Sequence, residues 1–261
     1  MRDETAPAAV LLVGHGTRDL AGQQEFLSLA GLARDRLADA RVQPAFLELA
    51  EPSIAAGLAA LNLRSHERLI VVPVLLFAAR HVKRDIPEAI GEVLCSKTPP
   101  LPIDVVYAPH LGCDPELLQL SAERFWQAYH ALGTPPLEKC FSLFVGRGTS
   151  DEDAIDEVRR FTQLRHQATP TGASRLCFVA AHPPSLLVTL RELETHSPGV
   201  LIVQPHLLFQ GHVLQQIRHD VLAWADGNPG WIVGFADHLG PNTALVELIE
   251  RRVRTEIIAN R

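Results

Sequence analysis

VGHGTRD, at residues 13–19, returns as VGRGTSD at residues 145–151, which lies 132 positions further along the chain. Three more stretches recur in the same order: AFLELAEPS at 45–53 as CFVAAHPPS at 177–185, PVLLF at 73–77 as PHLLF at 205–209, and APHLG at 108–112 as ADHLG at 236–240. Matching stretches at a nearly constant offset indicate an internal duplication. The sequence therefore predicts two homologous domains, residues 1–132 and 138–261, with a linker within 130–139.

Each half of the chain alternates short apolar runs with amphipathic stretches. The apolar runs predicted to be strands are Val10–Val13, Val42–Leu47, Leu69–Phe77, Ile103–Ala108, Cys140–Val145, Leu176–Ala180, Val200–Leu208 and Trp231–Phe235. Helices are predicted between them, among others at Ile54–Leu61, Pro87–Leu94 and Pro115–Leu132. Continuous apolar strands that alternate with helices are typical of parallel sheets covered on both faces. We therefore expect an α/β fold of two domains, each with a four-stranded parallel sheet, and a cleft between them.

The composition excludes several classes of protein. The 261 residues include 24 Lys and Arg against 30 Asp and Glu, a net charge of −6, which argues against non-specific nucleic-acid binding. No apolar run reaches the roughly 18–20 residues of a membrane-spanning helix. The acidic start MRDE does not resemble a signal peptide, and the four cysteines show no C-x-x-C spacing. We expect a cytoplasmic protein with reduced thiols, without membrane or nucleic-acid partners.

Several histidines follow predicted strands, where ligands bind in parallel sheets. His15 stands between two glycines directly after the first strand, His81 follows the third strand, and Glu48 and Glu51 end the second. The corresponding positions of the second half hold Arg147, His182 and His212. Imidazoles together with a carboxylate can hold a divalent metal ion with an open coordination position.

Other interpretations of these residues remain open at this point. A histidine at a strand end is often an ordinary loop residue, although a turn does not need one between two glycines. His110 and His238, each in a His-Leu-Gly stretch, suit a structural turn. The P-loop and hydrolase-elbow motifs are absent, and Asp19 stands where a dinucleotide fingerprint needs its third glycine.

The longest motifs resemble those of the CbiX/SirB family of class II chelatases. They are VGHGTRD at 13–19, FLELAEPS at 46–53 and VPVLLFAARHVKRDIP at 72–87. The family inserts cobalt or ferrous iron into sirohydrochlorin without ATP, and this chain resembles its long form, with two fused copies. The resemblance implies that His15 and His81 bind the metal ion. Because two pyrrolic protons must leave as the metal enters, we further hypothesise that His15 also acts as general base. Glu48 or Glu51 would relay protons or orient an imidazole.

The resemblance also implies where the tetrapyrrole is held: at the end of the second strand and along the loop after the third. The implied substrate-binding residues are Arg18, Ala50, Glu51, Leu76, Phe77, Ala78, Ala79, Arg80, Arg147, His182 and His212. Basic side chains, namely Arg18, Arg80, Lys83, Arg84 and Arg147, would steer the polyanionic substrate. Arg147 stands where the second half would repeat His15, so we expect no complete second metal site.

The expected activity is insertion of Co²⁺ into sirohydrochlorin in cobalamin biosynthesis, with release of two protons and no organic cofactor. Fe²⁺ or Ni²⁺ are alternative metals, because the affinity of imidazole sites rises from Fe²⁺ through Co²⁺ to Ni²⁺ and does not identify the metal used. A ferrochelatase of sirohaem synthesis and a non-catalytic carrier of metal or tetrapyrrole are the alternative functions. A bilobal binding protein of the periplasmic kind is disfavoured. We expect a monomer, since two fused halves can form the cleft within one chain.

Overall fold

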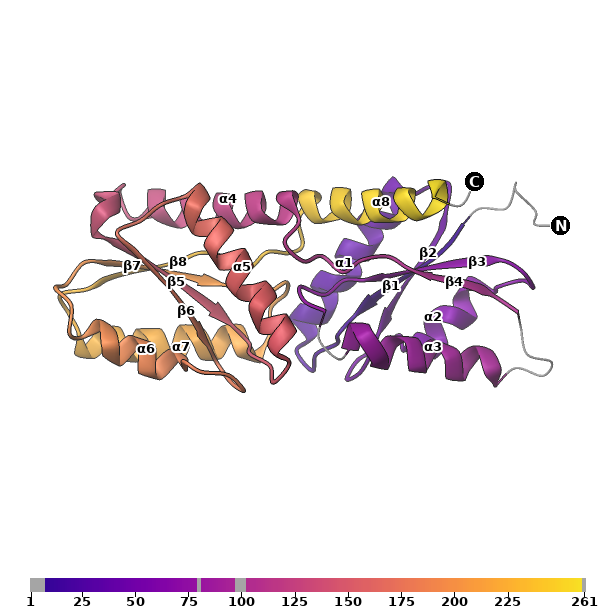
Figure 1. Cartoon of the computed structure of the whole chain (residues 1–261), viewed down its shortest axis with the longest axis horizontal. Coiled ribbons are helices and arrows are strands. Elements are labelled where there is room, and N and C mark those ends of the chain that lie inside the picture. Colours follow the sequence, from indigo (N-terminus) through magenta and orange to yellow (C-terminus); the bar gives the residue numbers. More distant parts are fainter. Residues whose placement is uncertain (1–7, 79–80, 97–101, 260–261) are drawn as a thin grey trace. The chain divides into compact units, whose positions relative to one another are not determined.

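The computed structural model describes residues 8–78, 81–96 and 102–259. They form two compact units of similar architecture (Figure 1). Unit 1 comprises the chain up to Gly112 together with Gly240 onward, and unit 2 comprises Cys113–Leu239. Within the described ranges, every helix is too short or too polar to span a lipid bilayer.

Both units contain a parallel four-stranded sheet. In unit 1 the strands, in the order β2-β1-β3-β4, are β1 (Ala9–Gly14), β2 (Arg41–Phe46), β3 (Arg68–Pro73) and β4 (Asp104–Tyr107). In unit 2 the order is β6-β5-β7-β8, with β5 (Cys140–Gly146), β6 (Ala173–Phe178), β7 (Val200–Pro205) and β8 (Ile232–Phe235). The predicted fold class, two homologous α/β halves with parallel sheets, is confirmed.

Helices connect successive strands, as the crossover connections of a parallel sheet require. Unit 1 contains α1 (Leu20–Arg36), α2 (Ile54–Leu61) and α3 (Ile86–Cys95), the last preceded by a π-helical turn, η1 (His81–Asp85). Unit 2 contains α5 (Glu152–Ala168), α6 (Leu186–Leu193) and α7 (His212–Gly227). Asp19 and Asp151, which are repeat equivalents, cap α1 and α5 by accepting a hydrogen bond from a first-turn backbone N–H.

Two predicted strands are too long. β3 ends at Pro73 and β7 at Pro205, although the apolar run continues to Phe77 and Leu208. The residues beyond Pro73 remain tied to the unit through other segments: Val74 N–H donates to the carbonyl of Val13 (2.8 Å), and the Leu75 carbonyl accepts from Leu111 (3.0 Å). An apolar run in the sequence indicates that its residues are buried and does not identify them as a strand. After β3 ends, the apolar residues Val74 and Leu76 are buried in a loop.

The last helix of each repeat packs in the other unit. Helix α4 (Pro115–Ala131) follows the fourth strand of the first repeat but contacts α5, β7 and β8 of unit 2. Helix α8 (Thr243–Ile258) follows the fourth strand of the second repeat but contacts α1 and β3 of unit 1. The compact units therefore differ from the predicted domains 1–132 and 138–261 by an exchange of helices. The predicted linker also overlaps α4, which runs through His130.

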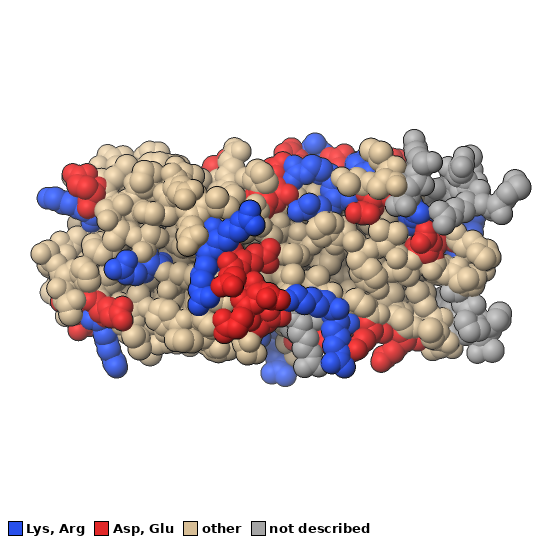
Figure 2. Space-filling view, viewed as in Figure 1, with Lys and Arg blue, Asp and Glu red and all other residues tan. Residues whose placement is uncertain are grey.

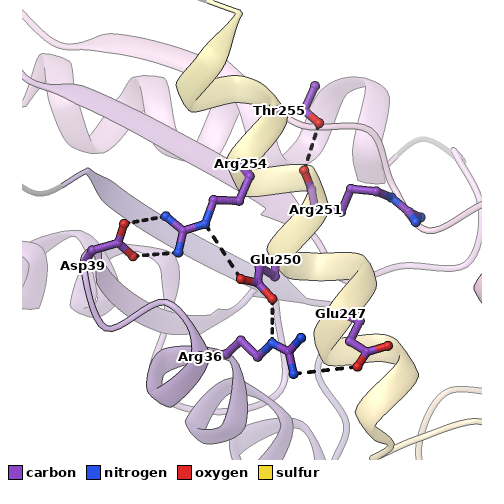
Figure 3. Close-up of polar contacts among 7 residues, drawn as sticks. All are labelled: Arg36, Asp39, Glu247, Glu250, Arg251, Arg254 and Thr255. Atoms are coloured by element: carbon purple, nitrogen blue, oxygen red, sulfur yellow. Dashed lines mark hydrogen bonds and ion pairs between the residues drawn. The ribbon is translucent and has the colours of Figure 1, made fainter.

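Apolar burial and ion pairs hold α8 on unit 1. Leu248, Ile249 and Val253 of α8 are fully buried. Beside this apolar face, Arg254 donates hydrogen bonds to both carboxylate oxygens of Asp39, and these bonds lower the pKa of the Asp39 carboxyl (Figure 3). Exposed ion pairs add little stability. The apolar face therefore supplies most of the attachment, and the ion pairs fix the position of the helix along α1.

Substitution of Leu248 by alanine tests this attachment. The variant should lose about 2–5 kcal/mol of unfolding free energy, because a fully buried leucine leaves a cavity. Hydrogen exchange should accelerate in β1 and β3 of unit 1 and stay unchanged in β5 and β7. Ile258→Ala, at a residue that is 68% exposed on the same helix, is the matched control and should change stability by less than about 0.5 kcal/mol. Acceleration confined to unit 2 would contradict the exchange.

His206 predicts a pH dependence of stability. The side chain is 3% exposed, its ring lies 4.2 Å from that of Phe161, and burial lowers its pKa to about 3. An unfolded histidine titrates near 6.5, so between pH 6.5 and pH 3 the unfolded chain binds a proton that the folded chain excludes. Stability is therefore lost as the pH falls below 6.5.

His206→Val should weaken this dependence, and valine is the residue that the first repeat has at this position, Val74. Urea unfolding at pH 7 and pH 5 measures it: the variant should lose about 1–2 kcal/mol less than the wild type over this interval. Equal losses in the two proteins would show that His206 does not contribute to acid sensitivity.

Candidate functional site

Backbone hydrogen bonds join the loops that follow β1 and β2 at the carboxyl edge of unit 1. Leu47 N–H donates to the Gly14 carbonyl (2.9 Å), and Glu48 N–H donates to the His15 carbonyl (3.1 Å). Gly16 adopts φ +100°, and a Cβ atom at this residue would lie 1.7 Å from the Glu48 carbonyl oxygen. Only glycine allows this approach.

These joined loops place an imidazole beside a carboxylate. Nδ1 of His15 lies 3.5 Å from Oε1 of Glu48 and 3.3 Å from the Gly16 carbonyl oxygen. Two oxygen acceptors beside Nδ1 favour the tautomer with its proton there, which leaves a lone pair on Nε2. The His15 side chain is 21% exposed and that of Glu48 48%. The edge thus presents an oriented imidazole to solvent.

The structure separates the two carboxylates that the sequence left as alternatives. Oε2 of Glu51 accepts a hydrogen bond from the backbone N–H of Ser53 (2.6 Å), the N-cap residue of α2. Between the two glutamates, Leu49 adopts φ 64° with its side chain half exposed, and Ala50 is partly buried. Glu48 is therefore the carboxylate that faces His15, whereas Glu51 stabilises the turn into α2.

The other predicted residues of unit 1 lie along two loops. Arg18 is exposed just before α1. After β3, Leu76 is buried, and Phe77 and Ala78 are partly buried. Ala79 and Arg80 lie outside the described residues.

His81 begins the π-helical turn η1, and its side chain is outside the described part of the structure. In the same turn, Lys83 is exposed. Nε of Arg84 donates a hydrogen bond to Glu88 (2.7 Å), and this ion pair competes with the predicted role of Arg84 in attracting substrate.

The repeat positions in unit 2 have different chemistry on the same backbone frame. Ala180 N–H donates to the Arg147 carbonyl (3.0 Å), as Glu48 does to His15, so an alanine stands in place of the carboxylate. Arg147 is exposed. His182 lies between two residues of α5: its Nε2 is 3.2 Å from Nη2 of Arg159, and its Nδ1 is 3.8 Å from Glu152.

His212, the repeat equivalent of His81, is exposed at the first residue of α7. A cavity of about 360 Å³ lies beside it in unit 2, lined by Val179, Ser185, Leu186, Leu187, His212, Val213, Gln216 and Asp220. Gln216 donates a hydrogen bond to Asp220 (2.7 Å) on the cavity wall. His212 thus borders a pocket of mixed polarity.

Among the residues whose side chains are described, no three of His, Cys, Asp and Glu are grouped so as to hold a metal ion. The described part of the proposed metal site is therefore His15 with Glu48 beside it. Glu152 and Arg159, which contact His182, were not predicted as site residues. Their approach depends on how α5 packs against the loop after β6, and no spacing in the sequence reports that.

Gly16→Ala tests the joined loops. The added methyl group would meet the Glu48 carbonyl, so the variant should lose more than about 2 kcal/mol of unfolding free energy, measured in urea. Gly31→Ala, in α1 with no heavy atom within 4 Å of the added Cβ, is the control and should gain up to about 1 kcal/mol. Equal stability of the two variants would show that the loops have room to separate.

Comparison with known proteins shows one family twice along the chain. A family model described as CbiX matches residues 9–128 and again 142–256. Both matched ranges lie within the predicted repeats, and together they include nearly all of the described residues.

Two relatives align over nearly the whole chain. It is 30% identical over 254 residues to a sirohydrochlorin ferrochelatase of Bacillus subtilis (strain 168). That alignment covers 97% of this chain and 92% of the relative. It is 26% identical over 245 residues to a sirohydrochlorin cobaltochelatase of Priestia megaterium, covering 94% of this chain and 78% of the relative.

Two solved structures share the fold. One is described as SirB from Bacillus subtilis with Fe³⁺; its TM-score is 0.82 at 30% identity, and the match covers 97% of this chain and 96% of the other. The second is the sirohydrochlorin chelatase SirB from Bacillus subtilis subspecies spizizenii in complex with cobalt. Its TM-score is 0.77 at 26% identity, with the same coverage of both chains.

Proposed function

Since the chain belongs to the CbiX family, we propose that it is a sirohydrochlorin chelatase, which inserts Fe²⁺ or Co²⁺ into the tetrapyrrole and releases two protons. The observation that carries the proposal is the His15–Glu48 pair at the carboxyl edge of the unit 1 sheet. Ligands bind at this edge in parallel sheets, and an oriented imidazole suits both a metal ion and proton transfer.

In this proposal, His15 and His81 are the protein ligands of the metal ion before it enters the macrocycle. Nδ1 of His15 faces Glu48 and the Gly16 carbonyl, so Nε2 is the atom that binds the metal. A carboxylate behind a ligating imidazole fixes the ring and strengthens it as a ligand. Two imidazoles leave most coordination positions to water or to the incoming pyrrole nitrogens, which suits an ion that must be passed on.

The ring nitrogens of the substrate must lose two protons as the metal enters. Once the metal ion has left Nε2 of His15 for the macrocycle, that nitrogen could take up a substrate proton. Glu48, half exposed beside Nδ1, could then accept the Nδ1 proton and pass it to water. Because its Oε2 binds the Ser53 N–H, Glu51 is proposed to shape the loop and to contact substrate, without a part in proton transfer.

The remaining predicted contacts complete the proposed substrate site. In unit 1 they are Arg18, Ala50, Leu76, Phe77, Ala78, Ala79 and Arg80; in unit 2 they are Arg147, His182 and His212. Arg147 and His182 offer cationic or hydrogen-bonding groups, which suit substrate carboxylates. The cleft expected between the halves stays a prediction.

The choice of metal stands between two candidates. From the sequence we expect Co²⁺, whereas the relative at 30% identity bears the name of a ferrochelatase. Imidazole ligands bind Co²⁺ more tightly than Fe²⁺ regardless of biological use. We therefore propose that the isolated protein inserts both metals and that their supply selects between them.

His15→Ala and His81→Ala test the metal ligands. Each variant should insert Co²⁺ into sirohydrochlorin at least about 100-fold more slowly than the wild type, followed by the absorbance change of the macrocycle. Near wild-type rates in both variants would contradict the assignment. A protein that binds metal and tetrapyrrole in equal amounts without turnover would be a carrier.

Glu48→Gln and Glu51→Gln form a matched pair for the proton-transfer role. Glu48→Gln should lower kcat about 10- to 100-fold, since an amide accepts no proton. Glu51→Gln should leave kcat within about threefold, because its carboxylate holds the Ser53 N–H instead. The opposite ranking of the two variants would transfer the role to Glu51.

Metal competition tests the proposed choice. With equal free Fe²⁺ and Co²⁺ under anaerobic conditions, we expect both metallated products, with cobalt in excess, since its imidazole complexes are stronger. Product made with iron alone would show that the site selects its metal by features beyond the two histidines.

A further inference from the structure

Unit 2 buries polar side chains of α5 and β7 in the region packed against α4. Unit 1 buries apolar side chains of α1 and β3 in the region packed against α8. Arg165 of α5 and Gln204 of β7 are 0% and 3% exposed. At the equivalent positions, 132 residues earlier, unit 1 has Ala33 and Val72, both buried. The surface on which α4 packs in unit 2 is therefore more polar than the homologous surface on which α8 packs in unit 1.

Arg165 is a buried cation held by aromatic rings. Its guanidinium carbon lies 5.4 Å from the ring centre of Phe125 and 6.0 Å from that of Phe144, and Nη1 donates to Thr169. Among the described residues, its Nε and Nη2 have no hydrogen-bond partner. Burial lowers its pKa to about 10, so the group remains charged at neutral pH. The ring of Phe125, which α4 supplies, is thus a principal source of its stabilisation.

Gln204 makes a second polar contact with the same helix. Its Nε2 donates to the backbone carbonyl of Ser121 in α4 (3.2 Å), within the buried layer. In α8, at the positions equivalent to Phe125 and Ser121, stand Val253 and Ile249. Helix α8 therefore has no aromatic ring for a buried guanidinium and carries a larger side chain where α4 has serine.

Unit 1 has contacts that only α8 can make. Arg36 of α1 pairs with Glu250 (2.6 Å), and Asp39 accepts hydrogen bonds from Arg254, as Figure 3 shows. These four residues form an ion network along the contact of α1 with α8.

The equivalent positions outside unit 1 are uncharged. Helix α4 has Ala122 and Trp126 where α8 has the glutamate and the arginine of this network. Unit 2 has Ala168 and Thr171 where unit 1 has Arg36 and Asp39. Neither helix can therefore make both sets of contacts. Helix α8 has the residues for the ion network on unit 1, and α4 has the ring for the cation–ring contact on unit 2.

We propose that these two sets of contacts sort the homologous terminal helices, so that unit 2 accepts α4 and rejects α8, while unit 1 prefers α8. Docking of α8 on unit 2 would leave Arg165 buried against valine, which is strongly unfavourable for a cation. Docking of α4 on unit 1 would forfeit the ion network and place Phe125 where Val253 fits. Buried polar groups can specify pairing at the expense of stability, as they do in coiled coils.

A nicked chain reports which helix docks where. A protease site is inserted between the exposed residues Gly133 and Thr134, and the folded protein is cleaved. In the exchanged arrangement each unit contains segments of both fragments, so the fragments should elute together until denaturant is added.

The recoded chain carries S121I, A122E, F125V and W126R on α4 with I249S, E250A, V253F and R254W on α8. Each helix then matches its own repeat, and after cleavage the two fragments should separate. A control chain with Q127A and T255A, at exposed positions of the same helices, should stay together. Recoded fragments that remain associated as tightly as the wild type would overturn the proposal.

A second measurement decides the case where the recoded chain fails to fold. F125V is compared in the wild type and in R165M by urea unfolding of the intact chain. Removal of the ring should lower the folding equilibrium constant about tenfold more beside the arginine than beside methionine. Equal effects in the two backgrounds would show that Arg165 does not discriminate between the helices, and would overturn the proposal.

Discussion

The site depends on the close contact of two backbone segments, at Gly16 and at Glu48. The Glu48 N–H binds the His15 carbonyl, and the Glu48 carbonyl lies where any Cβ at residue 16 would be. This contact carries the loop after β2 against the loop after β1, and so brings a carboxylate to Nδ1 of an imidazole. Orientation of the imidazole, and hence the choice of Nδ1 as the protonated ring nitrogen, follows from that backbone geometry.

Unit 2 retains this geometry and changes the side chains on it. Gly148 and the Ala180 carbonyl repeat the close contact, and the Ala180 N–H binds the Arg147 carbonyl. The second copy lacks the imidazole–carboxylate pair of the first and carries arginine and histidine, which suit anions. One backbone frame thus carries two kinds of side-chain chemistry.

Much of this architecture could be predicted from the sequence, because hydrophobic runs and repeat offsets report local structure and homology. Helix α2 begins and ends as predicted, and the strand ends locate His15 and Glu48 correctly at one edge. The helix exchange could not be predicted, because α4 and α8 each follow the fourth strand of their own repeat. This order in the sequence is the same whether a helix packs in its own unit or in the other one. Strand lengths were overestimated for a related reason: the burial of Leu76 comes from tertiary packing of a loop.

We propose that His15 and His81 together bind one metal ion. X-ray absorption spectroscopy of the protein loaded with one equivalent of Co²⁺ tests it most directly, because the imidazole contribution to the spectrum counts the histidine ligands. We expect two imidazoles per cobalt in the wild type and one after alanine replaces either histidine. An imidazole count that stays the same in both variants would contradict it.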